Sequence, residues 1–415
     1  MSAVSEVVRG VLPGERPRRA HLVDVLLVVL ALGLAFSITL SELTLVVLAV
    51  VLLSGASLNA LRRAPLTGPI LGFAGWTLLA AALSAEPADS LRAAKSLLPL
   101  ATFWIVLAAL PSAAAAWRFA TMLFVAVIAA ALSSIVQVLG CPASGTYGWP
   151  SQAPVIGLFF RGCARAHAFF SIYMTLAGVL TVVLMLMLAS LNRFARAGLA
   201  AAAWLVGAVA LGLTLVRGAW LGFVVGTGVT LTLVRRRLLA VALVVVLVAA
   251  ALAMPSVHRR LGTIGDPADD TTRDRLAMLV GGLRLVGEHP VVGVGPGQVK
   301  RLYPAYAPPE ALRRHTSHLH NTPLQIAVER GLVGLGLWFW IFVAFFVGAG
   351  RILRRLPATA TADRALVIGA LASVAAFLVS GVFEYNFGDT EVLLVALAAM
   401  ALPFVIERDL EGRAA

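Results

Sequence analysis

The chain has 415 residues, of which 60% are hydrophobic and only 13% are charged, and its mean hydropathy is +0.93. Soluble domains are about 45–50% apolar with roughly a quarter of their residues charged, so this composition excludes an ordinary soluble protein. The formal net charge of +13 does not indicate nucleic-acid binding, because arginine and lysine collect in the cytoplasmic loops of inner-membrane proteins.

The chain begins with a polar, arginine-rich stretch that does not resemble a signal peptide and is expected to stay in the cytoplasm. Apolar segments follow, each long enough to cross or nearly cross a hydrocarbon layer of about 30 Å. They are 22–37, 43–58, 69–83, 97–110, 119–139, 168–189, 199–215, 220–234, 238–254, 332–350, 365–382 and 392–406. The predicted fold class is therefore all-α: a polytopic integral membrane protein with about 12 transmembrane helices. A single transmembrane domain, 1–415, is expected, and the short linker 38–42 suggests that the first two spans form a hairpin.

Arginines in every second loop predict the orientation of the chain. The arginines predicted on the cytoplasmic side are Arg62, Arg63, Arg118, Arg193, Arg196, Arg235, Arg236, Arg237, Arg351, Arg354 and Arg355. Their recurrence agrees with the positive-inside rule. It leaves two long loops on the outer, periplasmic side, 140–167 and 255–322.

The second outer loop, 255–322, is about seventy residues long and is therefore expected to have a function rather than to be a simple connection. Periodicity predicts a helix over 273–287 and suggests a second, short helix over 309–314. The sequence GVGPGQ at 293–298 follows no strand and lacks the lysine and serine of a phosphate-binding loop. Its glycines are interpreted as tight turns.

Three of the 7 histidines, His315, His318 and His320, lie within six residues of one another just before the apolar segment 332–350. Imidazole titrates near neutral pH, so this cluster is a candidate for proton transfer. The alternative is a solvated loop whose histidines bind backbone or lipid headgroups. Three histidines can also bind zinc, but the usual ligand spacings and an adjacent carboxylate are absent from the sequence, so no metal site is expected.

The only two cysteines, Cys141 and Cys163, fall in the first outer loop. The compartment outside the inner membrane is oxidising, so a disulfide that closes this loop is expected. Two free thiols near the membrane interface are the alternative.

Positive charges on the outer side run against the sorting rule and need another cause. They are Arg161, Arg165, Arg217, Arg259, Arg260, Arg273, Arg275, Arg284, Lys300, Arg301, Arg313 and Arg314. An anionic ligand such as a diphosphate would explain them, because guanidinium pairs bidentately with phosphate oxygens. Alternatively, they reach lipid headgroups or pair with acids of the loop. For Arg217, which has almost no loop around it, a functional role is favoured. The acidic segment 384–391 could face the same site.

Two segments resemble motifs of the O-antigen ligases, which belong to the O-antigen ligase and polymerase superfamily. HNTPLQIAVERGLVG is similar to the family's histidine motif and supplies His320 and Asn321, with Gly331 and Gly334 at the family's spacing. RLAMLVGGLRLVGEHPVVGVGPGQ begins at Arg275 and is similar to the family's arginine helix and the Pro–Gly-rich turn after it.

Two further segments add to the resemblance. VRGAWLG looks like the family's arginine–tryptophan motif and supplies Arg217 and Trp220, while RAHAFFSIYM, which begins at Arg165, looks like its arginine segment before a span. One departure is that the family's aromatic residue a turn after the loop arginine is absent, with Met278 or Leu279 near that place.

The resemblance implies a glycosyltransferase of lipopolysaccharide biosynthesis in the inner membrane of a Gram-negative bacterium, acting at the periplasmic face. It implies transfer of a glycan from undecaprenyl diphosphate to lipid A–core. His320 would be the general base, kept unprotonated by surrounding arginines, and Arg217 and Arg275 would bind the diphosphate. The reaction would be inverting and would need neither a metal nor another cofactor. Further substrate-binding candidates are Arg161, Arg165, Trp220, His318, Asn321, Arg313 and Arg314.

The expected partners are these two substrates and membrane lipids, with no nucleic acid, and a monomer is favoured. An O-antigen polymerase or an oligosaccharyltransferase of the same superfamily is an open alternative. An anion transporter is a third candidate. It predicts ionisable residues along the membrane path, but the nearest, Asp24 and Glu42, lie close to the ends of the predicted spans.

Overall fold

The computed structural model describes residues 16–53, 64–141, 159–160, 162–234 and 270–414. Within these ranges the chain forms helices and loops and no strand. The helices are α2 (Arg16–Phe36), α3 (Ile38–Leu53), α5 (Thr67–Ala82), α6 (Pro87–Ala93), η1 (Ala94–Ala101), α7 (Thr102–Ala109), α8 (Ala113–Leu139), α10 (Tyr173–Leu188), η2 (Leu191–Arg193), α11 (Ala197–Leu213), α12 (Arg217–Leu233), α15 (Asp270–Glu288), α16 (Val299–Tyr306), α17 (Thr322–Arg355), α18 (Thr361–Gly381) and α19 (Thr390–Ala414).

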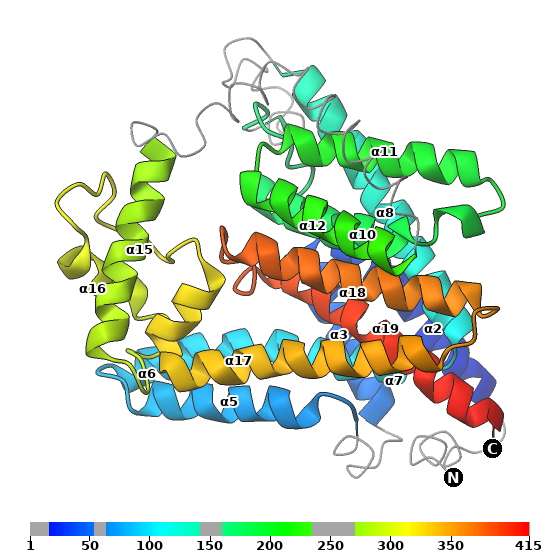
Figure 1. Cartoon of the computed structure of the whole chain (residues 1–415), viewed down its shortest axis with the longest axis horizontal. Helices are drawn as coiled ribbons and strands as arrows, with labels where there is room; N and C mark the ends of the chain where they lie inside the picture. Colours follow the sequence, from blue (N-terminus) through cyan, green and yellow to red (C-terminus); the bar gives the residue numbers. More distant parts are fainter. Residues whose placement is uncertain (1–15, 54–63, 142–158, 161, 235–269, 415) are drawn as a thin grey trace.

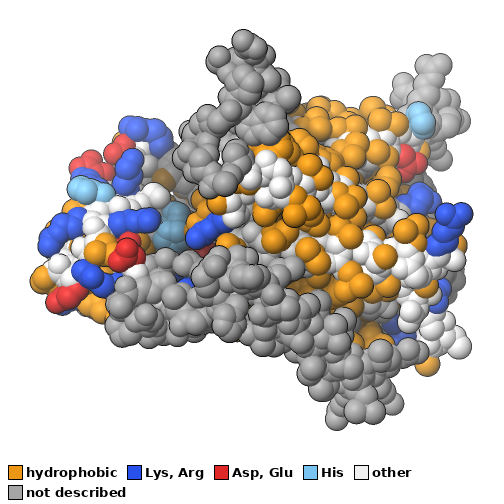
Figure 2. Space-filling model, turned by 90° about the horizontal axis from the view of Figure 1, so that it is seen from above, with side chains coloured by type: hydrophobic (Ala, Val, Ile, Leu, Met, Phe, Trp, Pro, Cys, Tyr) orange, Lys and Arg blue, Asp and Glu red, His pale blue; other side chains and the backbone are white. Residues whose placement is uncertain are grey.

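The long helices lie side by side in one bundle, and α15 lies crosswise at one end of it, with α16 beside it (Figure 1). The centre of the bundle is formed by α18, which packs against α10, α12, α17 and α19. Figure 2 shows hydrophobic side chains over the middle of the face that it presents, whereas charged side chains gather at the two ends. An apolar belt between polar ends is the surface that a bilayer-spanning bundle requires.

Six of the described helical segments are long and apolar enough to cross a membrane. They are Arg19–Phe36, Pro87–Ala109, Ala113–Leu139, Thr322–Arg355, Thr361–Gly381 and Thr390–Gly412. Four shorter apolar helices, α3, α5, α10 and α11, accompany them. The chain is therefore a multi-pass membrane protein with an all-helical architecture in its described part.

Most of the predicted spans coincide with these helices. Eleven of the twelve segments fall wholly or in part on described helices, while 238–254 and the last residues of the second segment, 54–58, lie outside the described residues. The hairpin expected at the start is formed, because only Ser37 separates α2 from α3 and the two helices pack together. The number of membrane crossings itself stays a prediction.

One predicted helix boundary and one predicted short helix are wrong. The segment 168–189 becomes helical only at Tyr173, because Ala168 has a φ of 52° and its N–H donates to Gln137 Oε1 at 3.1 Å. The short helix expected over 309–314 is absent, and α16 lies earlier in the chain. In the segment 309–314, the backbone N–H of Arg313 donates to Asp274 Oδ1 of α15 at 3.0 Å. In a helix this N–H would instead donate to a backbone carbonyl of the same segment.

The helix α17 is interrupted near the site, at Gly331, which has φ 68° and ψ −177°. The interruption leaves the carbonyls of Val328 and Glu329 free to accept hydrogen bonds from Val294 and Gly295, at 2.9 and 3.0 Å. A Cβ on Gly331 would lie 2.0 Å from the carbonyl oxygen of Val291, so only glycine fits. The segment 322–330 is thus a separate half-helix, and the glycine-rich segment GVGPGQ holds it through these hydrogen bonds.

Candidate functional site

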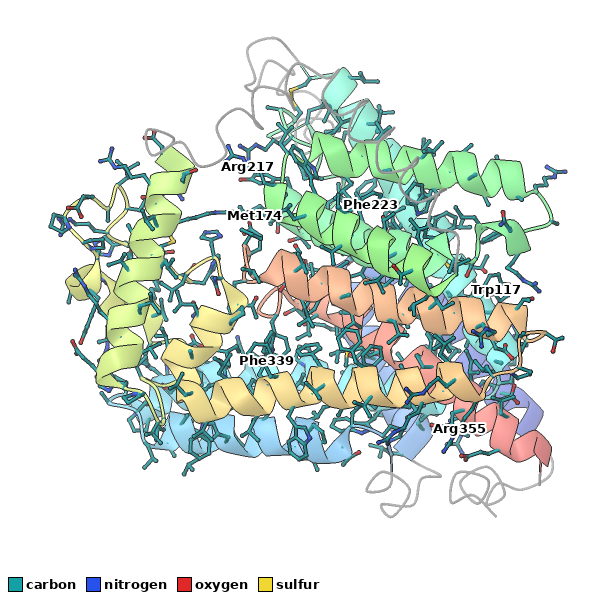
Figure 3. The ribbon with its side chains drawn as sticks, viewed as in Figure 1. Trp117, Met174, Arg217, Phe223, Phe339 and Arg355 are labelled. Atoms are coloured by element: carbon teal, nitrogen blue, oxygen red, sulfur yellow. A yellow bond between two sulfur atoms is a disulfide. The ribbon has the colours of Figure 1, made fainter. Side chains whose placement is uncertain are left out.

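A cavity of about 630 Å³ lies at the α15 end of the bundle, between α15 and the ends of α10, α12 and α18. Its ionisable lining residues are Arg165, Tyr173, Arg217, Asp270, Asp274, Arg275, Arg313, His320 and Glu384. Figure 3 places Arg217 and Met174 at this end of the bundle, and Arg355, which was predicted on the cytoplasmic side, at the opposite end. The cavity thus brings together arginines from three separate parts of the chain.

His320 lies two residues before the start of α17, in the connection 307–321 that follows α16. Its φ of 48° is in the left-handed region, which costs a non-glycine residue roughly 1–3 kcal/mol. The neighbouring residues hold this conformation: Leu319 N–H donates to Gln325 Oε1, and Asn321 Oδ1 caps α17 by accepting from Leu324 N–H, both at 2.9 Å. A strained residue held by its neighbours on both sides is a common feature of functional sites.

The half-helix that carries these partners is itself anchored by a buried ion pair. Arg330 Nη1 lies 2.7 Å from Glu329 Oε2, and Arg330 Nε donates to Thr77 Oγ1 of α5 at 3.1 Å. The other oxygen of Glu329 accepts from Gln325 Nε2 at 2.8 Å. Gln325 therefore connects the ion pair to the backbone of Leu319, directly before the histidine.

Glu384, in the loop between α18 and α19, contacts both His320 and Arg275. Its Oε2 lies 3.0 Å from His320 Nδ1, and its Oε1 accepts from Arg275 Nη2. An ionised carboxylate can only accept, so Nδ1 is the donor and, in the neutral ring, Nε2 carries the lone pair. Arginines were expected around His320, but the charged group in direct contact with its ring is a carboxylate, and Arg275 lies on the other side of that carboxylate.

His318 packs edge-to-face against His320, with ring centroids 4.3 Å apart, and lies 5.7 Å from the ring of Tyr385. Its Nδ1 is buried and has no hydrogen-bond partner among the described residues. Burial, followed by the neighbouring His320, lowers the pKa of His318 from 6.5 to about 4, and Glu384 opposes this shift. His318 is therefore neutral at physiological pH, and it does not line the cavity.

Arg217 begins α12, and only three residues, 214–216, separate it from the end of α11 at Leu213. Leu215, in the connection, has a φ of 57°, a second left-handed non-glycine conformation next to the cavity. The tight turn places the guanidinium group of Arg217 in the cavity wall together with the amino-terminal end of α12. The positive end of the helix dipole adds to the attraction for an anion there.

Two more arginines line the cavity in different ways. The guanidinium carbon of Arg165 lies 4.4 Å from the ring centroid of Tyr173, in a cation–π contact. Arg313 Nε lies 3.1 Å from Asp274 Oδ2, and the Arg313 side chain is 71% exposed. Arg165 is thus held against an aromatic face, whereas Arg313 lies at the open rim.

The structure does not bring every predicted residue to the cavity. Trp220 Nε1 donates to the carbonyl of Leu211 at 3.1 Å and so joins α12 to α11. Neither Trp220 nor Arg314 lines the cavity, and Arg161 lies outside the described residues. Asn321 lines it, but its side chain caps α17.

Cys141 and Cys163 form a disulfide with a Cα–Cα distance of 5.4 Å. It joins the end of α8 to the segment that carries Arg165. Gln137 strengthens this connection, because its Oε1 accepts from the backbone N–H groups of His167 and Ala168 at 3.0 and 3.1 Å. The position of Arg165 therefore depends on its covalent and hydrogen-bonded attachment to α8.

The contacts of Glu384 are the main feature that sequence reasoning missed. The acidic segment 384–391 was noted, but its carboxylate meets a histidine 64 residues away, and local pattern carries no such information. No group of three or more His, Cys, Asp or Glu residues with a metal-binding arrangement occurs in the part of the chain that the structure describes.

These features define a multi-pass helical membrane protein with a cavity lined by arginine and histidine at one end of its bundle. Residues 201–339 match the model of a family described as O-antigen ligase. This match includes Arg217, Arg275 and His320, and it supports the O-antigen ligase superfamily for that part of the chain. No curated protein matches the chain.

Proposed function

We propose that the protein is an O-antigen ligase, which transfers a glycan from undecaprenyl diphosphate to lipid A–core at the periplasmic face of the inner membrane. The observation that carries this proposal is one cavity lined by several arginines and by a histidine whose Nδ1 contacts Glu384, so that Nε2 carries the lone pair in the neutral ring. The histidine suits removal of a proton from a hydroxyl, and the guanidinium groups suit a diphosphate leaving group.

The reaction follows from these roles. His320 Nε2 takes the proton of an acceptor hydroxyl while its oxygen attacks the anomeric carbon of the donor glycan. The bond from that carbon to the phosphate oxygen breaks, and its electron pair leaves with undecaprenyl diphosphate. Arg217 and Arg275 stabilise the charge that grows on the diphosphate. A single displacement of this kind inverts the anomeric centre and needs no further reactant.

The other cavity residues support binding rather than proton transfer. Arg165 and Arg313 add positive charge at the inner wall and the rim of the cavity, where an anionic donor enters. His318 stays neutral and packs against the base instead of contacting substrate.

The test uses detergent-purified protein and an undecaprenyl-diphosphate-linked glycan, with lipid A–core or additional donor as acceptor, each with and without chelator. Glycan on lipid A–core, formed equally well with chelator, is the expected result. Longer glycan on the lipid diphosphate would identify a polymerase with the same site. Transfer to neither acceptor would refute the proposal and favour an anion transporter.

A further inference from the structure

We propose that Glu384 is a positioning residue that makes the strength of the base depend on donor binding. The inference rests on the proposed function of the same cavity. Glu384 uses one carboxylate oxygen for Arg275 and the other for His320 Nδ1. In this arrangement a single negative charge is shared between the arginine that would hold the diphosphate and the histidine that would take the proton.

Burial and backbone contacts fix the carboxylate and leave the arginine free to move. The side chain of Glu384 is 9% exposed, that of His320 is 18% exposed and that of Arg275 is 29% exposed. The backbone carbonyl of Glu384 accepts from Thr322 Oγ1 at 2.9 Å, and Thr322 also donates to Asn386 Oδ1 at 3.0 Å. Of the two groups that Glu384 contacts, Arg275 is the more open to the cavity and the one that an incoming ligand can draw away.

A diphosphate competes with Glu384 for Arg275, because it offers more negative charge and two oxygens in bidentate geometry. Once Arg275 turns to the donor, the carboxylate charge of Glu384 faces His320 alone. There it stabilises the imidazolium that forms when Nε2 takes the hydroxyl proton, and Nδ1–H stays on its nitrogen throughout. Proton removal is thereby favoured only after the donor is in place.

Glu384→Gln keeps the shape of the side chain and removes its charge. We expect two effects of opposite sign: undecaprenyl diphosphate binds about 3- to 10-fold more tightly, and kcat falls about 100-fold or more. The first follows because Arg275 no longer has a competing carboxylate, and the second because the imidazolium loses its counter-charge. A merely structural role for Glu384 predicts weaker binding together with slower turnover, and that result would overturn the proposal.

The matched control is Glu86→Gln, which removes a carboxylate from another Glu–Arg pair, Arg301 with Glu86, away from the cavity. It should leave both undecaprenyl diphosphate binding and kcat within about 2-fold of wild type, since exposed ion pairs contribute little. If Glu384→Gln does not fold, Glu384→Asp replaces it. Its shorter side chain cannot reach both partners, so kcat should fall about 10-fold, and an unchanged kcat would overturn the proposal.

A double variant tests whether Glu384 acts through His320. The combination His320→Ala with Glu384→Gln should turn over as slowly as His320→Ala alone, because a partner of the base has no effect once the base is gone. Additive losses would overturn the proposal. The binding measurement with undecaprenyl diphosphate needs no acceptor, so it separates failure of this inference from failure of the proposed ligase activity.

Discussion

At the scale of single residues, the base is the first assignment to test. His320→Ala should lower kcat about 1,000-fold, within the range of general-base catalysis, because His320 is the only histidine among the described residues that line the cavity. Binding of undecaprenyl diphosphate should stay close to that of wild type, because the diphosphate is assigned to the arginines and not to the ring. Equal activity of the variant would move the role of base to His318.

Arg217→Ala should weaken binding of undecaprenyl diphosphate and slow turnover together. Arg217 lines the cavity from the first turn of α12, so in the proposed mechanism it would contact both the bound donor and the charge that develops on it. We expect a loss of roughly 100-fold in kcat, comparable to the effect of removing one hydrogen-bond donor that stabilises the transition state. Arg284→Ala, an exposed arginine of α15 outside the cavity, is the control and should behave as wild type.

The buried imidazole of His318 predicts a pH dependence of stability. Its pKa is lowered from 6.5 to about 4 in the folded protein, so the unfolded chain binds the proton more readily. The free energy of unfolding should therefore decrease as pH falls from about 6.5 to about 4, and it should be insensitive to this group above that window. Melting curves in detergent across this range measure it, and His318→Asn should flatten the pH profile. An identical profile in that variant would contradict the assignment.

At the scale of elements, the disulfide ties α8 to the arginine segment. Reduction of the disulfide should weaken donor binding several-fold, because the Arg165 segment then loses its covalent tie to α8 and keeps the hydrogen bonds to Gln137, while kcat at saturating donor should change less. Binding of undecaprenyl diphosphate with and without dithiothreitol measures this effect. The double variant Cys141→Ser, Cys163→Ser is the control: it should show the weaker binding in both conditions.

The break in α17 gives a matched pair of glycine substitutions. Gly331→Ala should destabilise the protein by several kcal/mol, because the new Cβ meets the Val291 carbonyl in a left-handed conformation. Gly336→Ala, in the same helix, meets nothing within 4 Å and should be neutral or stabilise by up to about 1 kcal/mol. Thermal unfolding compares the two, and equal melting temperatures would show that the break does not require glycine.

At the scale of the whole molecule, hydropathy predicted most helices because lipid demands a continuous apolar run from any spanning helix. The predicted segment 365–382 and the helix Thr361–Gly381 illustrate the agreement. The arginines of the cavity were singled out because, in the predicted orientation, they violate the sorting of charge. The pairing of Glu384 with His320 and the true position of α16 depend on contacts between distant segments, and a single sequence does not contain them.

The cavity is completed late in the synthesis of the chain, because the last of its lining residues lie near the end of the sequence. Its lining begins at Arg165 and ends at Glu384, so α2, α3, α5 and α8 are synthesised before any of it exists. At roughly 5–20 residues per second, the ribosome needs about 10 to 45 s to translate from the first lining residue to the last. Throughout that interval the half-inserted chain lacks the carboxylate that meets His320. A truncated or stalled chain therefore has an incomplete cavity, and under the proposed function only a nearly finished chain would begin to transfer glycan.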